Sequence, residues 1–243
     1  MKKVLLVLCL SLLLTGCNSS QPSTTADPTI SVETMTQTAN ATDGTPLVEW
    51  SYPSFSLQLS DPQATQAMEQ DLQGRIDGWM ASSTDLESYA QAEYTGQEWT
   101  LWFARLTCKV ARADSQVISL YLEYSEFTGD SHPSILTDSR TYSSATGQPL
   151  QLTDLLAESY ALTGLASPVN ALLAERAQEL YDDYEALVGK AFSDGTVQWY
   201  LSDQGLCFHF SPYVIAPYAS GPICVTVPYD QLSQVLHPDY LPA

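Results

Sequence analysis

Alternating apolar and polar positions predict a three-stranded unit in the middle of the chain. Within residues 98–112, alternate positions are occupied by Trp102, Ala104, Leu106, Cys108 and Val110, which is the period of a strand with one buried face. The alternation resumes in 118–124 after a turn at Asp114-Ser115, so the two segments should pair as a hairpin. A third, more polar strand is expected over 135–143.

Apolar residues at helical spacing predict two main helices. The first should begin at Asp61-Pro62, which places a capping residue before a proline in the first turn. The second should run from Ser167-Pro168 to Gly189. The apolar stripe of the first helix is Met68, Leu72, Ile76 and Trp79, and that of the second is Val169, Leu172, Leu173, Leu180, Tyr184 and Leu187.

Residues 199–229 should form a strand pair, an aromatic loop and a closing strand. The turn 202–205 ends in Gly205, which can take a positive φ without a steric penalty. Apolar residues alternate with Cys207 and His209 in the next strand. Pro212 and Pro217 cannot donate to a sheet, so the chain should leave the sheet after Phe210 and return at Ile223.

These elements predict an α+β fold with a mixed or antiparallel sheet packed against two main helices. Residues 47–57 are interrupted by Pro53 and should form an edge strand or two short strands. We expect one ectodomain over 46–243, made of an N-terminal hairpin lobe (46–149) and a C-terminal lobe (150–243).

The N-terminus predicts secretion and lipid anchoring. In residues 1–16, Lys2 and Lys3 precede a short apolar run, as in a signal peptide, and the run is too short to span a membrane. Leu14-Thr15-Gly16-Cys17 resembles the bacterial lipobox, which implies lipidation of Cys17. We therefore expect the protein on the outer face of the cytoplasmic membrane. An ordinary signal peptide with an incidental Cys17 is the alternative.

Residues 17–45 should form the lipidated cysteine and a disordered tether. The segment from Asn18 to Thr45 is dominated by Ser and Thr, contains no aromatic residue and shows no helix or strand period. It cannot bury enough apolar surface to fold by itself.

The charge excludes nucleic acid as a partner. Loss of Lys2 and Lys3 with the signal lowers Lys plus Arg from 9 to 7 against 28 Asp plus Glu, which gives a formal charge of −21. Phosphate binding requires cations, whereas an acidic surface favours cationic partners. The alternative is that the charge serves solubility.

Three cysteines remain after the signal and Cys17: Cys108, Cys207 and Cys224. Secretion permits disulfides, and Cys207 and Cys224 could be bridged if their strands are neighbours. With His209 they could form part of a soft-metal site, but no fourth ligand is evident. Buried thiols are the favoured interpretation, with no metal or cofactor.

The sequence contains few candidate catalytic residues. Asp130, Ser131 and His132 are neighbours in one turn and cannot present the geometry of a nucleophile, base and orienting group. The hydrolase, metalloprotease and phosphate-loop motifs are missing from the sequence. We therefore expect no catalytic residues and no enzymatic activity.

The aromatic loop is the better functional candidate. Tyr213 and Tyr218 could stack on a sugar ring or anchor a protein partner, with Pro217 and His132 as further candidate binding residues. The alternative, which the Ile-Ala-Pro surroundings favour, is that the tyrosines plug the end of the sheet.

A motif in this region supports a family resemblance. Residues 212–222 follow Pro-Tyr-x-Ile-Ala-Pro-Tyr-Ala-x-Gly-Pro, and 223–229 follow Ile-x-Val-x-Val-Pro-Tyr. With Gly129-Asp130-Ser131-His132-Pro133 and the run Thr146–Leu155, the pattern resembles the extracytoplasmic domain of unknown function in RsiV-type anti-sigma factors. The same domain precedes the catalytic domain of PdaC-type peptidoglycan deacetylases. The resemblance covers about residues 47–236.

The resemblance implies an α+β ectodomain on a Gram-positive-type cell surface. It also implies a lysozyme-type partner, because the RsiV-type domain binds lysozyme, which is a basic enzyme. The anti-sigma segment, transmembrane helix and deacetylase domain of these families are not expected here, and Asp130 replaces the second glycine of the family's loop. Signalling through a sigma factor therefore does not transfer.

We thus expect a lipid-anchored binding or sensor module for a cationic lysozyme-type protein or a cell-wall component such as a peptidoglycan fragment. The alternatives are an envelope hydrolase, a glycan-processing accessory protein or a purely structural envelope lipoprotein.

Overall fold

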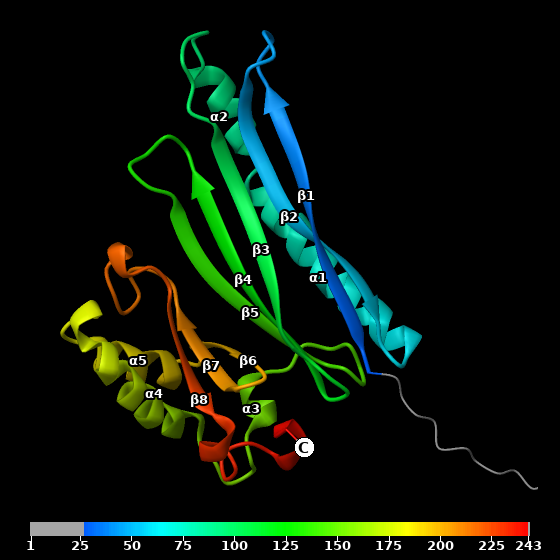
Figure 1. Ribbon diagram of the computed structural model, residues 1–243, viewed down its shortest axis with the longest axis vertical. Coiled ribbons are helices and arrows are strands. Elements are labelled where there is room, and N and C mark those ends of the chain that lie inside the picture. The colour runs from blue at the N-terminus through cyan, green and yellow to red at the C-terminus, as the bar shows by residue number, and fades with distance from the viewer. Residues whose placement is uncertain (1–26, 243) are drawn as a thin grey trace, which may run out of the picture.

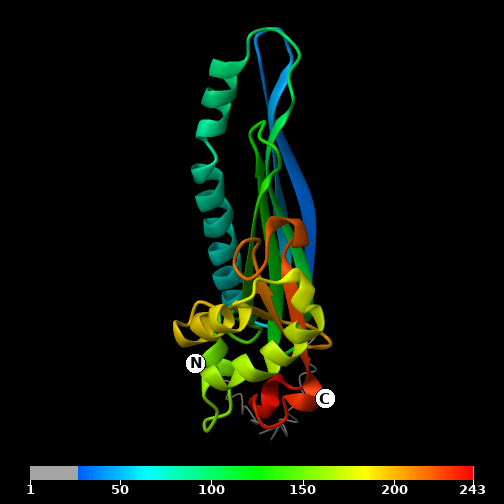
Figure 2. The same cartoon turned by 90° about the vertical axis from the view of Figure 1, so that its left-hand side faces the viewer.

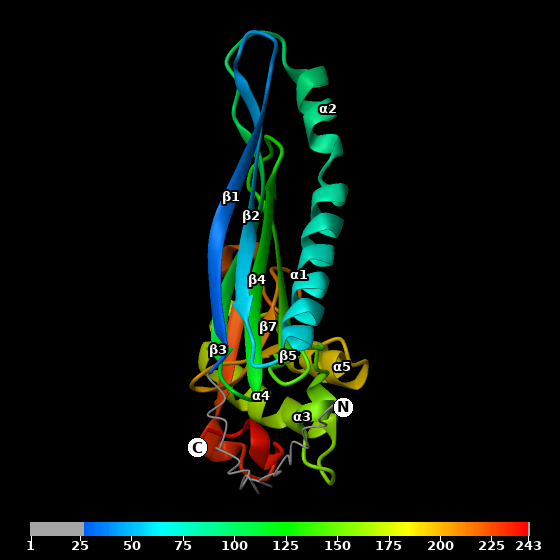
Figure 3. The same cartoon turned by 90° about the vertical axis from the view of Figure 1, so that its right-hand side faces the viewer.

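The computed structural model describes residues 27–242, in which two β-sheets pack face to face between two groups of helices (Figure 1). Helices α1 and α2 run end to end along one face of the longer sheet (Figure 3). Helices α4 and α5 lie across the lower half of the molecule, against the shorter sheet (Figure 2). The α+β prediction is confirmed. None of the helices within residues 27–242 is long and apolar enough to cross a membrane.

The longer sheet has five strands in the order β1-β2-β3-β4-β5 and is mixed. All neighbours are antiparallel except β2 and β3, which pair in parallel over Val48–Ser51 only. The expected hairpin and third strand are therefore confirmed. The strands are β1 (Thr29–Asn40), β2 (Pro46–Gln58), β3 (Trp102–Ala113), β4 (Val117–Phe127) and β5 (Ser134–Ser143).

The shorter sheet is antiparallel in the order β6-β7-β8. Its strands are β6 (Gln198–Leu201), β7 (Gly205–Phe210) and β8 (Ile223–Pro228). The chain leaves this sheet after Phe210 and returns at Ile223, as the prolines predict. The apolar residues of β7 and β8 face α4 and α5 and form the largest apolar cluster in this part of the molecule.

The helices cover the outer faces of the two sheets. Helix α1 begins after Asp61, whose side chain accepts a hydrogen bond from the backbone N–H of Gln63 at 2.9 Å, as its sequence predicts. Met68, Leu72 and Ile76 of α1 are buried against β4 and β5. The helices are α1 (Pro62–Ser82), α2 (Asp85–Glu93), α3 (Leu152–Leu155), α4 (Ala166–Leu173) and α5 (Tyr184–Ser193).

The prediction of a disordered tether was wrong for the part of residues 17–45 that the structure describes. Residues 29–40 form β1, which pairs with β2 along its whole length. The β-branched residues of this segment suit a strand, and β2 supplies the hydrogen-bond partners and the packing surface that the segment lacks by itself. The signal peptide and Cys17 lie outside the described residues.

The second predicted helix is divided in two. Helix α4 ends at Leu173 and is followed by a 3₁₀ turn, and α5 then begins at Tyr184 and continues through Gly189. The backbone N–H of Tyr181 donates to the carbonyl of Ile215 at 3.0 Å. This contact with a distant loop replaces a helical hydrogen bond, which periodicity could not predict.

Two further predictions about single residues need correction. Gly205 does not have a positive φ; a Cβ atom there would lie 2.1 Å from the carbonyl oxygen of Val227, so glycine is needed for close strand approach. Pro53 does not break β2, which is one continuous strand. The β2–β3 pairing ends at Ser51, so no β3 ladder bond is lost at Pro53.

The two sheets meet through hydroxyl groups, not through an apolar face. We call Ser119, Thr137, Ser139 and Thr141 the hydroxyl layer. The Ser119 hydroxyl accepts from the backbone N–H of Leu201 at 2.9 Å, and the Ser139 hydroxyl donates to the carbonyl of Trp199 at 2.6 Å. The layer thus bonds the backbone of β6 to side chains of β4 and β5.

His209 of β7 is fully buried in the same interface. Its Nδ1 lies 2.8 Å from the Thr137 hydroxyl, and its Nε2 lies 2.9 Å from the Ser139 hydroxyl. Tyr121 packs edge-on against the ring, and Tyr200 lies beside it. Burial lowers the pKa of His209 to about 4, although the charge of Asp138 opposes this shift.

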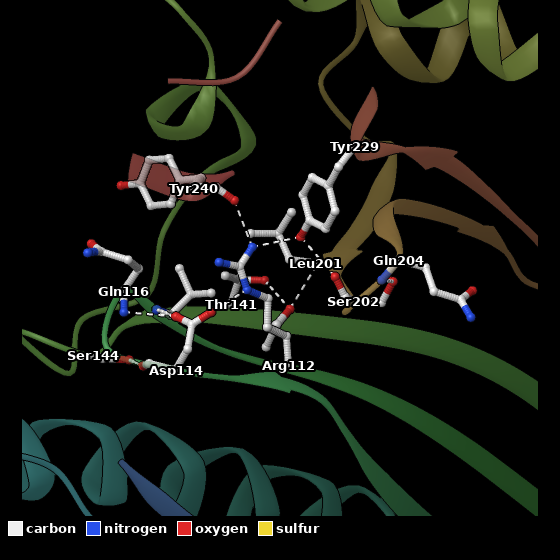
Figure 4. Close-up of polar contacts among 12 residues, drawn as sticks. Arg112, Asp114, Gln116, Thr141, Ser144, Leu201, Ser202, Gln204, Tyr229 and Tyr240 are labelled. Atoms are coloured by element: carbon white, nitrogen blue, oxygen red, sulfur yellow. Dashed lines mark hydrogen bonds and ion pairs between the residues drawn. The ribbon is translucent and has the colours of Figure 1, made fainter. Parts of the chain in front are cut away.

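Arg112 joins the sheets at the opposite end of the interface (Figure 4). This buried side chain donates to Asp114 at 2.5 Å, to the Tyr229 hydroxyl at 2.7 Å and to the carbonyl of Tyr240 at 2.7 Å. Burial by itself would raise the pKa of Asp114, but the backbone N–H of Val117 and the guanidinium of Arg112 hold it below its usual value. Arg112 therefore connects the end of β3 to the C-terminal residues of the domain.

Acid should weaken the fold through His209. The unfolded chain protonates this residue near its ordinary pKa of 6.5, but the folded protein does so only at about 4. Neutral, buried His209 therefore contributes fully to the free energy of unfolding above pH 6.5. This free energy should fall by roughly 3 kcal/mol as the pH is lowered from 6.5 to 4, because only the unfolded chain gains a proton on His209 in this range. Urea unfolding of the wild type and of His209→Gln at several pH values measures this loss, which should be much smaller in the variant.

The matched control for this experiment is His237→Gln, because the His237 side chain is about half exposed. Its pH profile should follow that of the wild type. Equal losses in the wild type and in His209→Gln between pH 6.5 and 4 would contradict the assignment.

Arg112→Met should destabilise the protein by about 3 kcal/mol, because Asp114 and the Tyr240 carbonyl lose their buried partner. Arg105→Met is the control: the Arg105 side chain is 43% exposed, its Glu49 partner is 3.5 Å away, and the expected loss is below about 1 kcal/mol. The free energies of unfolding in urea at pH 7 compare the two. Similar losses would show that Arg112 does not hold the sheets together.

Candidate binding surface

Three of the predicted binding residues form one aromatic stack on the surface. The His132 ring lies parallel to that of Tyr218, with centroids 3.8 Å apart and planes at 20°. Tyr213 follows at 5.8 Å from Tyr218, with planes at 34°. We call His132, Tyr213 and Tyr218 the aromatic platform. Pro217, the fourth predicted residue, is exposed beside Tyr218.

The aromatic platform combines loops from both sheets. His132 lies in the loop that joins β4 to β5, and the two tyrosines lie in the loop that joins β7 to β8. The Ser211 hydroxyl accepts from the backbone N–H of Thr137 at 2.9 Å, which ties the start of the second loop to β5. The sheet interface therefore determines how His132 meets Tyr218.

The β7–β8 loop is anchored by apolar residues and turns its aromatic residues outward. Ile215 and Ala216 are buried in the cluster under α4 and α5. Tyr213 is 60% exposed, and its backbone N–H donates to the carbonyl of Ala216 at 2.9 Å. The interpretation that the two tyrosines plug the end of the sheet is therefore wrong for Tyr213, whereas Tyr218 is half-buried; the buried residues of the loop are Ile215 and Ala216.

Tyr213 has an unusual backbone conformation. Within residues 27–242 it is the only residue other than glycine with a positive φ, at 69°. Such a conformation costs about 1–3 kcal/mol for an ordinary side chain and persists only where the surroundings impose it. A strained residue that exposes a large aromatic ring suggests a role in binding.

Three acidic residues are close in the sequence to residues that form or contact the platform loops. Asp130 precedes His132 in its loop, and Asp182 and Asp183 follow Tyr181, whose N–H bonds to the β7–β8 loop. All three carboxylates are exposed. Glu179, also near this loop, is paired with Arg176 at 2.6 Å, and this pairing lowers its pKa.

The Asp130-Ser131-His132 sequence forms no catalytic relay. Nδ1 of His132 lies 3.1 Å from the carbonyl of Pro133, and the Asp130 carboxylate accepts from the hydroxyl of Thr128 at 3.1 Å. The His132 ring is therefore oriented by stacking on Tyr218 and by its own turn.

Comparison with known proteins identifies the type of domain. Residues 153–230 match the family described as "Protein of unknown function (DUF3298)", and residues 40–135 match the family described as "Deacetylase PdaC". The chain contains a PdaC/DUF3298-type domain of unknown function. No curated protein matches the chain.

Solved structures of DUF3298 proteins share this fold. A family member from Bacteroides fragilis is 18% identical with a TM-score of 0.59, and the match covers 87% of this chain and 94% of that one. A family protein from Pseudomonas aeruginosa is 18% identical with a TM-score of 0.54, and the match covers 88% of this chain and 97% of that one. At this identity the likeness concerns the fold alone.

Cys108, Cys207 and Cys224 are free thiols in the described part of the chain, so the Cys207–Cys224 disulfide that was considered is not formed. Cys207 is opposite Thr226, with its Sγ 3.1 Å from the threonine hydroxyl, whereas Cys224 is opposite His209. The two cysteines share a face but are diagonal neighbours, a spacing that is too wide for a bridge. Cys108 is partly buried, which raises the pKa of its thiol to about 12.

No group of three or more His, Cys, Asp or Glu side chains in the described part of the chain could hold a metal ion. His209, which had been considered as a ligand, uses both ring nitrogens on the hydroxyl layer instead. Sequence reasoning identified the platform residues but not their contact, because 86 positions separate His132 from Tyr218 and only the sheet interface brings them together.

Proposed function

We propose that this PdaC/DUF3298-type domain is an extracytoplasmic binding module that captures a cationic protein, most concretely one of lysozyme type, on its aromatic platform. The main support for the proposal is the surface stack of exposed His132, half-buried Tyr218 and exposed Tyr213, built by two loops from different sheets. Lipidation of Cys17 would hold the module at the outer face of the cytoplasmic membrane.

The chemistry of the platform suits a protein partner. Tyrosine offers a large amphipathic contact surface with few rotatable bonds and is enriched among residues that dominate binding energy. The platform is already stacked, so little side-chain entropy remains to be lost on binding. The exposed Val214 adds apolar area beside Tyr213.

The charge of the protein indicates which sign of charge the partner should have. Exposed Asp130 is in the loop of His132, exposed Asp182 and Asp183 follow Tyr181, which is bonded to the β7–β8 loop, and the whole chain has 28 acidic against 9 basic residues. Such a surface attracts a basic protein and accelerates its encounter, and salt screens the attraction.

The deacetylase name of the family that matches residues 40–135 makes glycan processing the rival proposal. We propose a role without catalysis, because the aromatic platform offers contact surface and no relay of nucleophile and base. Release of acetate or of fragments from purified peptidoglycan by the protein would favour the rival.

Calorimetry with lysozyme tests the proposal. The chain without its first 17 residues should bind lysozyme with a micromolar or lower Kd at low salt, and Tyr213→Ala should weaken binding about tenfold or more. Tyr89→Ala is the matched control, because Tyr89 on α2 is 61% exposed, as Tyr213 is at 60%. This control should bind like the wild type.

Charge is tested separately by salt and by the double variant Asp182→Asn, Asp183→Asn. Affinity should fall as salt rises, and the neutralised variant should show a weaker affinity and a flatter salt dependence. No heat at low or high salt would overturn lysozyme as the partner, and equal losses in Tyr213→Ala and Tyr89→Ala would place binding elsewhere.

A further inference from the structure

A second candidate site lies on the opposite face of the β4–β5 hairpin from the aromatic platform. A cavity of about 630 Å³ is lined there by the C-terminal half of α1 and by the ends of β4 and β5 that adjoin their connecting loop. Its position does not depend on the proposed function, because none of the three platform residues lines it.

The cavity exists because the helices leave this part of the sheet uncovered. The buried face of α1 covers the middle of β4 through Met68, Leu72 and Ile76. Farther along, the helical layer moves toward β2 and β3, where Leu86 and Ala90 of α2 are buried (Figure 1). The distal ends of β4 and β5 therefore have no helix above them, and Leu136 is 61% exposed.

Aromatic and charged groups line this cavity together. Trp79 of α1 and Tyr124 of β4 supply two aromatic rings, and Arg75 of α1 is paired with Asp138 of β5 at 2.7 Å between Nη1 and Oδ2. Arg75 retains further N–H donors, and the Asp138 carboxylate retains lone pairs. Ser82 and Ser134 add hydroxyls at the border.

The charge of the lining argues against an anionic ligand. Arg75 is the one cation of the lining and is already paired, while Glu126 and Asp138 are both acidic. The remaining guanidinium N–H groups can donate to sugar hydroxyls, the remaining carboxylate lone pairs can accept from them, and an aromatic ring packs well on the C–H face of a sugar. The volume is within the range of about 300–1,000 Å³ that is usual for small-ligand sites.

We propose that this cavity binds one residue of a neutral glycan, with its ring against Trp79 or Tyr124 and its hydroxyls on the Arg75–Asp138 pair. The site is a binding site without a chemical step. It gives the domain a second ligand class beside the protein partner of the platform.

Calorimetry with defined tetrasaccharides tests the proposal. The probes are cellotetraose, the N-acetylated tetramer of glucosamine, and the same glucosamine tetramer without acetyl groups, which is cationic. At least one neutral tetramer should bind the chain without its first 17 residues with a millimolar or lower Kd, which corresponds to about −4 kcal/mol or better. The cationic tetramer should bind no better than its acetylated counterpart.

A pair of variants locates the binding. Ser134→Tyr places a large side chain at an exposed position that lines the cavity and should weaken binding at least about tenfold. Ser31→Tyr makes the same change at an exposed position of β1 outside the cavity lining and should leave binding unchanged. Thermal unfolding of both variants checks that each is folded.

Three results would overturn the proposal: no binding of either neutral tetramer at about 10 mM, binding of the cationic tetramer alone, or equal binding by Ser134→Tyr and the wild type. None of these results bears on lysozyme binding at the platform, so the two proposals fail separately.

Discussion

Hydroxyl groups on β4 and β5 meet the backbone of β6 and the ring of His209, and these hydrogen bonds determine how the two sheets lie on each other. A hydrogen bond depends on angle as well as distance, so this contact permits fewer alignments than an apolar surface would. Each buried partner that loses its bond costs about 1–3 kcal/mol. The alignment is therefore specific, and shifts between the sheets are expensive.

Other features of the domain follow from this alignment. Alternate residues of β4 and β5 point to α1 on one side and to the shorter sheet on the other, so the central strands are covered on both faces. At one end of the interface, Arg112 ties β3 to the C-terminal residues. At the other end, Thr137 holds Ser211, and the two adjoining loops form the aromatic platform.

The local pattern predicted most strands because apolar residues recur along them with period two. The α1 cap, the β3–β4 hairpin and the proline-bounded loop all depend on neighbours in the sequence, and each was predicted. Errors arose where a distant partner decides the structure. Residues 29–40 become a strand because β2 is beside them, and the second predicted helix divides where Tyr181 bonds to Ile215.

For the candidate site, too, the sequence predicted local features but not contacts between distant segments. Composition and motif selected Tyr213, Tyr218 and His132, but the sequence could not show that Tyr213 is exposed or that His132 stacks on Tyr218. Nothing in the sequence indicated the cavity beside Trp79. Its lining comes from one helix and two strands that are far apart in the sequence and become neighbours only in the folded protein. Period and motif report local structure, and sites between segments depend on the tertiary fold.

Strand β1 has a consequence for how the domain is presented. It begins at the end of the long sheet where the C-terminal turns lie and rises along β2 for 12 residues, or about 40 Å. Because β4 runs in the same direction as β1 (antiparallel to β3, which is parallel to β2), the β4–β5 loop points away from the end where β1 starts. The described chain therefore starts at the end of the long sheet that is opposite to the β4–β5 loop, and β1, which is paired with β2 along its whole length, covers the distance between these two ends.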